Sequence, residues 1–289
     1  NFLRAINIST VPVAAETEVT REVQGIEVVL VLDVTGSMAS GSNYIELQKA
    51  AYDFIDTLYS RVKDPDYLRI GIVPYASTVN IGSVAPDLVG ADPATGEIPG
   101  LPNGVTYDPL DETKWAGCVY ARDPDDDILD TDTDEGGLWD AFWWEHSETN
   151  QWDSTVDEDA EIDTRHIISY ETEDGYDIAK VTSTLGNNKT TPNLGCPVDN
   201  PIVPLTNNRT VLDTATRNLT YWNRGGTIGA FGMAWGWRVL SPKEPFTDGR
   251  PYDDPYWRKY AVIMTDGQNG FYCHQNGNCS SNGPQDDTA

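Results

Sequence analysis

Three oxygen-bearing side chains, Asp33, Thr35 and Ser37, follow an unbroken apolar run at residues 28–32. Such a run is typical of a strand that is covered on both faces at the centre of a parallel sheet. Gly36 permits a turn at this point, and carboxylate and hydroxyl oxygens suit a hard divalent cation such as Mg²⁺. The alternative is that Asp33 and Ser37 only cap the following helix.

Two later boundaries between predicted elements carry matching side chains. Thr227 opens a helical stretch after two glycines, and Asp266 follows an apolar strand. The carboxyl ends of neighbouring strands in an open parallel sheet meet at one crevice, where ligands bind. We therefore predict one divalent cation, Mg²⁺ or else Ca²⁺ or Mn²⁺, at this crevice. The side chains that chain order could bring within reach of this cation include Asp33, Thr35, Ser37, Thr227 and Asp266, the five predicted ligands that match the family pattern named below.

The elements that must position these residues predict an α/β fold. Residues 44–60 have the apolar spacing of a helix, and residues 68–75 form a second strand, which together with the first gives a strand–helix–strand unit. Residues 211–219 and 227–240 are predicted helices, and 260–264 a third strand. Glycines within the second of these helices reduce its helix propensity but permit close packing against the sheet.

Composition divides the chain into five segments. Residues 1–25 alternate weakly, as an edge strand or a stalk does, and residues 271–289 are a Gly- and Asn-rich tail. Residues 26–80 and 206–270 are the two parts of the regular domain. Between them, residues 81–205 are rich in Pro, Gly, Asn, Asp and Trp, which predicts a long, irregular, acidic insertion.

The insertion contains a run that resembles a calcium loop. Residues 123–163 hold 17 Asp or Glu and no Lys or Arg, and Asp130, Asp132 and Asp134 stand at alternate positions before glycines. Glu135 and Ala141, however, occupy the positions where an EF-hand needs its glycine and its bidentate Glu. Two hypotheses stay open, a second site that binds calcium and a solvated acidic loop.

The four cysteines form no CxxC pair and have no histidine at zinc-ligand spacing. We predict two disulfides, Cys118–Cys196 across the insertion and Cys273–Cys279 as a local clip. Disulfides favour an extracytoplasmic compartment. The alternative is four free thiols in a cytosolic protein.

Charge and motifs exclude several classes of function. A net charge of −27 argues against nucleic-acid binding and against docking on anionic membranes, which both require Lys and Arg. The chain has no apolar run of about 18 residues, so we predict no membrane span in it. It also has no Gly-x-Ser-x-Gly, His-Glu-x-x-His or P-loop motif, and we do not predict an enzyme.

The order and spacing of the five ligands resemble the von Willebrand factor A domain, whose adhesion site has the pattern Asp-x-Ser-x-Ser followed by a Thr and an Asp. Thr35 replaces the first Ser and keeps its hydroxyl. A closer resemblance, over residues 15–80 and 196–270, is to TadG-like proteins of bacterial tight-adherence (Flp) pilus assembly. It is carried by VLDVTGSM, RIGIVPYASTVN, GGTIGAFGMAWGWRVLSP and AVIMTDGQN.

The resemblance implies a Rossmann-like von Willebrand A domain with a metal-ion-dependent adhesion site (MIDAS), at the bacterial cell surface, in the periplasm or secreted. Its function would be non-enzymatic: the cation would capture a carboxylate of a protein partner, in pilus assembly or surface attachment. The alternative is a structural subunit of a surface filament or envelope assembly, in which the metal only stabilises the fold.

The same resemblance raises an expectation about the ends of the chain. The family's sheet continues beyond the strand at residues 260–264, and its N-terminal membrane anchor has no counterpart in this sequence. We therefore expect a fragment, self-assembly, or completion of the sheet by another segment.

Overall fold

The computed structural model describes residues 25–111, 114–122, 129–143, 167–171, 177–181, 193, 195–221, 227–267, 272–273 and 279–280. Of these, 167–171, 177–181, 272–273 and 279–280 are described by their backbone. Most of the predicted edge strand or stalk (residues 1–25) lies outside the described residues, as do residues 144–166 of the acidic insertion and most of the predicted tail. Only Gly25 of the first segment is described, as the start of the first strand.

The long strands of the central sheet are β1 (Gly25–Asp33), β2 (Leu68–Tyr75) and β8 (Trp257–Met264). Its short strands are β3 (Val79–Asn80), β4 (Cys118–Val119) and β7 (Val203–Thr206). Two separate ribbons consist of β5 (Ile167–Glu171) with β6 (Asp177–Val181), and of β9 (Tyr272–Cys273) with β10 (Cys279–Ser280). The α-helices are α2 (Asn43–Arg61), α3 (Ala85–Leu88), α5 (Thr133–Gly136), α6 (Arg209–Arg217) and α7 (Gly229–Leu240). The 3₁₀ turns are η1 (Gly36–Ala39), η2 (Pro65–Tyr67) and η3 (Gly82–Val84).

The central sheet has the strand order β4–β3–β2–β1–β8, and β7 also pairs with β2. Its three long strands are parallel, with β1 between β2 and β8. The short strands β3, β4 and β7 add to it in antiparallel fashion. The predicted α/β class with a parallel sheet at its centre is therefore confirmed.

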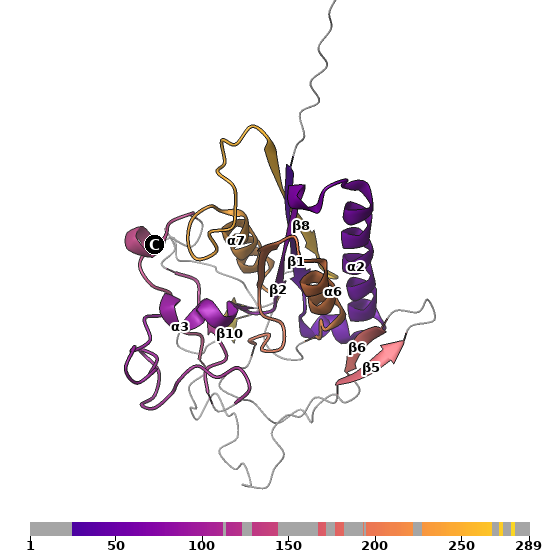
Figure 1. Ribbon diagram of the computed structural model, residues 1–289. Helices are drawn as coiled ribbons and strands as arrows, with labels where there is room; N and C mark the ends of the chain where they lie inside the picture. The colour runs from indigo at the N-terminus through magenta and orange to yellow at the C-terminus, as the bar shows by residue number, and fades with distance from the viewer. Residues whose placement is uncertain are drawn as a thin grey trace, which may run out of the picture.

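Helices cover both faces of this sheet, with α2 and α6 on one side and α7 on the other (Figure 1). Successive residues of a strand point to opposite faces, so the apolar run in β1 supplies both cores. Leu30 packs with Ile55 of α2 and Leu212 of α6, whereas Val31 packs with Trp235 of α7. Because both faces of the strand are buried, every residue of the run is apolar.

Glycines bring α7 close to the sheet. A Cβ atom at Gly236 would lie 2.7 Å from Val31, and one at Gly232 would lie 2.6 Å from the ring of Tyr75. The helix can therefore sit directly on β1 and β2, as its glycine content predicted. Its start at Gly229 leaves Thr227 just outside the helix.

Part of the predicted insertion belongs to the main domain. The strand β4 and all but the last residue of β7 come from residues 81–205. They pair with β3 and β2, which belong to the regular domain. Trp115 and Trp139 from the same segment are 0% and 2% exposed and join the core beneath α7. Residues whose composition indicated an irregular loop therefore form part of the central sheet and of the core.

The predicted disulfide between Cys118 and Cys196 is confirmed, with 5.7 Å between the two Cα atoms. Cys273 and Cys279 are directly opposite each other in the antiparallel β9–β10 ribbon. Their side chains lie outside the described part of the chain, so that second disulfide stays a prediction.

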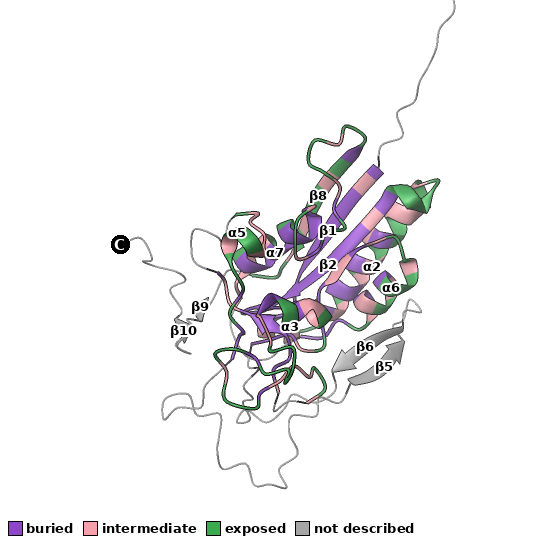
Figure 2. Cartoon of the chain, turned by 60° about the vertical axis from the view of Figure 1, so that its left-hand side comes forward, coloured by how far each residue is buried: buried purple, intermediate pink, exposed green. Residues whose placement is uncertain are grey.

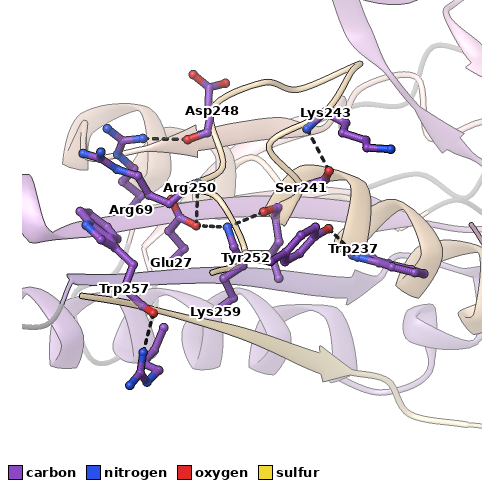
Figure 3. A network of polar contacts seen from close by, with 12 residues as sticks. Glu27, Arg69, Trp237, Ser241, Lys243, Asp248, Arg250, Tyr252, Trp257 and Lys259 are labelled. Atoms are coloured by element: carbon purple, nitrogen blue, oxygen red, sulfur yellow. Dashed lines mark hydrogen bonds and ion pairs between the residues drawn. The ribbon is translucent and has the colours of Figure 1, made fainter. Parts of the chain in front are cut away.

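A buried ion pair joins β1 and β8 at their amino ends (Figure 3). Glu27 is fully buried and pairs with Lys259, its register partner on β8. The Arg250 backbone N–H donates to Glu27 at 2.9 Å, and Lys259 donates to the Leu240 carbonyl at 2.7 Å. Because both charges have several partners, the cost of burying them is offset locally.

Within the described ranges, no helix is long and apolar enough to cross a membrane.

Replacing Cys118 and Cys196 together by Ala should lower the free energy of unfolding by about 2–4 kcal/mol, because the crosslink restricts the unfolded chain over a long loop. The measurement is urea unfolding under non-reducing conditions, followed by Trp fluorescence. The Cys273→Ala/Cys279→Ala variant is the control, and its loss should be smaller because the stretch between these residues is short. Equal losses in the two variants would contradict this account.

Candidate metal-binding site

Four of the five predicted ligands lie at the carboxyl ends of β1 and β8. Asp33 is the last residue of β1 and is fully buried. Thr35 is buried just before η1, whereas Ser37 is exposed within it. Asp266 is exposed two residues after β8. Since β1 and β8 are parallel neighbours, their turns meet at one edge of the sheet, as the sequence predicted.

A continuous hydrogen-bonded row joins three of these side chains. Thr35 Oγ1 lies 3.0 Å from Ser37 Oγ, and Ser37 Oγ donates to Asp266 Oδ1 at 2.9 Å. The other oxygen of Asp266, Oδ2, accepts from Asn43 Nδ2 at 2.8 Å. We call Thr35, Ser37 and Asp266 the oxygen row.

Asn43 is a member of the site that sequence reasoning missed. It is the first residue of α2, where polar residues are common for reasons unrelated to a ligand, so its type carried no separate signal. Only the approach of the β8 turn, 223 residues later in the chain, shows what its side chain contacts.

Asp33 lies behind the oxygen row and ties the two turns together. Its Oδ1 accepts from the Thr35 backbone N–H at 2.9 Å, and its Oδ2 accepts from Thr265 Oγ1 at 2.6 Å. Neither η1 nor α2 has a side-chain hydrogen bond at its N-cap. The helix-capping alternative is therefore wrong for Asp33 and Ser37, since their side chains bond to the turns instead.

Thr227 reaches the same edge of the sheet but stands apart from the row. The Ile228 backbone N–H donates to the Ala76 carbonyl at 3.2 Å, which holds the start of α7 beyond the end of β2. Among the described residues, the Thr227 side chain makes no hydrogen bond to the other four predicted ligands.

Tyr75, the last residue of β2, is a second neighbour that the sequence did not indicate. It is 1% exposed, and its carbonyl accepts from the Val34 N–H at 2.9 Å. Burial and then the charge of Asp33 raise the pKa of the Tyr75 hydroxyl to about 12, although a hydrogen bond with Thr265 acts in the opposite direction. Tyr75 is therefore neutral beside the carboxylates at physiological pH.

Two of the three Asp residues of the predicted calcium loop have separate hydrogen-bond partners. Asp130 accepts from the hydroxyls of Ser241 and Tyr252, each at 2.8 Å. Asp132 caps α5 by accepting from a backbone N–H, and Asp134 is exposed.

A guanidinium lies among the backbone oxygens of this loop. Buried Arg122 donates to the Thr131 carbonyl at 2.8 Å and to the Asp132 and Gly137 carbonyls at 3.3 Å. A positive charge at this place opposes the binding of a cation by the same loop. This favours the other hypothesis, an acidic loop without calcium, although Asp130 is bonded rather than solvated; the calcium site stays a prediction.

The donor set of the candidate site is mixed. In the described part of the chain, no three His, Cys, Asp or Glu side chains are grouped so that they could hold a metal ion. The candidate site has two carboxylates, Asp33 and Asp266, and takes its other oxygens from hydroxyls. Hydroxyl and carboxylate oxygens are the donors that Mg²⁺ and Mn²⁺ accept.

The raised pKa of Tyr75 predicts a loss of stability in alkali. Because this pKa of about 12 exceeds the ordinary value of 10.0, the contribution of Tyr75 to stability is complete below pH 10 and is lost as the pH rises through 12. Over this interval, the free energy of unfolding of the wild type should fall more steeply than that of Tyr75→Phe. Urea unfolding in EDTA at a series of pH values measures both, and equal slopes would refute the assignment.

Comparisons with protein-family models, with curated proteins and with solved structures found no match to this chain.

Proposed function

We propose that this domain binds one Mg²⁺ at the oxygen row, with Mn²⁺ or Ca²⁺ as alternatives, and through it captures a carboxylate of a protein partner. The observation that carries the proposal is the spacing of 3.0 Å and 2.9 Å between successive oxygens of the row. Octahedral Mg²⁺ holds its ligands at about 2.1 Å, which separates neighbouring ligand oxygens by about 3 Å. The donors present fit such an ion.

The charge of the donor set supports carboxylate capture. Thr35 and Ser37 contribute neutral oxygens, and Asp266 contributes one charge. Asp33 supplies a second charge from behind the row, directly or through water, and Thr227 is the remaining candidate ligand. Hydroxyl ligands leave a divalent cation with more of its attraction for a further carboxylate than an all-carboxylate set would.

The fold and the sequence pattern support a place in the von Willebrand factor A family. The Asp33-x-Thr35-x-Ser37 turn ends the central strand of a parallel sheet that has helices on both faces, which is compatible with that family's MIDAS site. The motifs quoted above extend the proposal to a TadG-like protein. The Cys118–Cys196 disulfide supports an extracytoplasmic location, at the bacterial surface, in the periplasm or secreted.

Calorimetric titration of MgCl₂, MnCl₂ and CaCl₂ into EDTA-treated protein tests the metal site. We expect one ion per chain and at least tenfold weaker binding in Asp266→Ala, because that variant removes a charged ligand from the row. The matched control is Asp66→Ala, since Asp66 also accepts from an asparagine amide, at 3.0 Å from Asn207, but lies outside the site. Binding that survives unchanged in Asp266→Ala would overturn the assignment.

Carboxylate capture is tested with a short peptide that carries one Glu, beside the same peptide with Gln. The Glu peptide should bind the Mg²⁺-loaded protein and be released by EDTA, because only a carboxylate completes the coordination of the ion. Equal binding of the two peptides would point to a metal site that serves stability alone.

A second candidate function, self-assembly in a surface structure, is favoured by β8. Among the described strands it pairs only with β1 and forms an edge of the sheet. Tyr260 is 52% exposed and Ile263 45% exposed, on opposite faces of the strand. Figure 2 shows exposed and half-buried residues along β8 beside the buried strands β1 and β2. Unpaired apolar edges of this kind add further strands.

Ile263→Lys should weaken any such association at least tenfold, because a charge on an edge strand opposes strand addition. Sedimentation velocity over a range of protein concentrations, with and without EDTA, measures the effect. Val211→Lys is the matched control, since Val211 is 43% exposed on α6, a helix that contacts α2, β2 and β7. A wild type that stays monomeric, or an Ile263→Lys variant that associates equally well, would exclude β8 as the assembly edge.

A further inference from the structure

We propose that Asn43 sets the metal selectivity of this site, favouring Mg²⁺ and Mn²⁺ over Ca²⁺. The inference rests on the proposed function, because it needs a cation beside Ser37 and Asp266. It goes further by assigning a role to a residue outside the predicted ligand set. The hydrogen bond of 2.8 Å from Asn43 Nδ2 to Asp266 Oδ2 carries it.

The two oxygens of Asp266 have different partners. Oδ1 accepts from the Ser37 hydroxyl at 2.9 Å and belongs to the oxygen row, whereas Oδ2 is bonded to Asn43. A carboxylate only accepts hydrogen bonds, so the amide nitrogen of Asn43 must be the group that faces it. A cation at the row would therefore meet one oxygen of Asp266, Oδ1, whose hydrogen-bond donor Ser37 is itself a predicted ligand, while Asn43 occupies the other oxygen.

A single available oxygen discriminates between cations. Mg²⁺ takes six ligands at about 2.0–2.1 Å in near-ideal octahedral geometry, and one oxygen from a carboxylate satisfies it. Ca²⁺ takes six to eight ligands at about 2.3–2.6 Å and commonly uses both oxygens of a carboxylate. By occupying Oδ2, Asn43 opposes this bidentate mode without adding a negative charge.

Asn43 is well placed to hold Asp266 in one orientation. It begins α2, a helix anchored in the core by buried Leu47, Ala51 and Ile55. Its backbone N–H donates to the Ser40 carbonyl at 3.3 Å, at the end of the turn that carries Ser37. The N-cap residue of α2 is Ser42, and Asn43 is the first residue inside the helix, so capping does not account for the asparagine. Hydrogen-bond partners of ligating carboxylates act in this way, by fixing the ligand's orientation.

The test is the ratio of the Ca²⁺ and Mg²⁺ dissociation constants, measured by separate calorimetric titrations of EDTA-treated protein. Wild type should bind Mg²⁺ more tightly than Ca²⁺. In Asn43→Ala the Ca²⁺ dissociation constant divided by the Mg²⁺ dissociation constant should fall by about tenfold. This is the lower end of the effects of removing such partners. Both oxygens of Asp266 then become available to Ca²⁺.

Two further variants sharpen the test. Asn207→Ala is the matched control, because it removes an amide–carboxylate hydrogen bond of 3.0 Å to Asp66 outside the site, and its ratio should equal that of the wild type. Asn43→Ser keeps a residue suited to a helix start and carries the test if Asn43→Ala fails to fold.

The outcomes separate this inference from the proposed function. Tight Mg²⁺ binding with an unchanged ratio in the folded Asn43 variants overturns the role of Asn43 and leaves the metal site standing. A wild type that prefers Ca²⁺ also overturns it. A wild type that binds neither ion overturns both proposals.

Discussion

The parallel register between β1 and β8 is the constraint on which the site depends. Residues from the two ends of the chain reach one another only because Leu32 is opposite Met264, which brings Asp33 and Thr265 to the same edge. A slip by one residue would reverse the faces of every side chain in the strand. The Glu27–Lys259 pair holds this register at the amino ends of the strands, and the Asp33–Thr265 hydrogen bond holds it at the carboxyl ends. The buried ion pair and the candidate site thus lie at opposite ends of the same pair of strands.

The chemistry of the edge follows from a balance between charge and neutral donors. Two carboxylates so close together repel each other, and here hydroxyl and amide donors separate them. Ser37 and Asn43 each donate to Asp266, while Thr265 and the Thr35 backbone donate to Asp33. A cation at the proposed site would replace part of this hydrogen bonding. The acidic character of the whole chain, at −27, adds a field that attracts cations.

The metal-binding and self-assembly proposals concern different parts of the same strand. Asp266 follows β8, and the exposed edge residues Tyr260 and Ile263 lie within it. Partner capture depends on the turn, whereas strand addition depends on the backbone edge and on apolar surface. The two activities can therefore coexist, and the metal dependence of each distinguishes them.

Local sequence determined the long elements and most of the site. The apolar run of β1 specified a buried central strand, and the Asp33-x-Thr35-x-Ser37 turn specified oxygens at its end, because both signals depend on neighbouring residues. The later strand and its Asp266 followed from the same kind of pattern. The Cys118–Cys196 pairing was also predictable, since few pairings were available.

Only the tertiary structure decided which residues surround these oxygens. The sequence indicates only a helix start at Asn43, and the structure shows that β8 brings Asp266 against it. The sequence likewise indicates only a strand end at Tyr75, and the structure places Asp33 beside it. Arg122 lies among the loop carbonyls that the acidic spacing suggested for calcium. The irregular segment that supplies β4 and β7 joins the core through partners remote in sequence. Except for Arg122, whose partners are 9 to 15 residues away, the deciding contact in each case is between residues far apart in the chain. Local sequence patterns carry no record of such contacts.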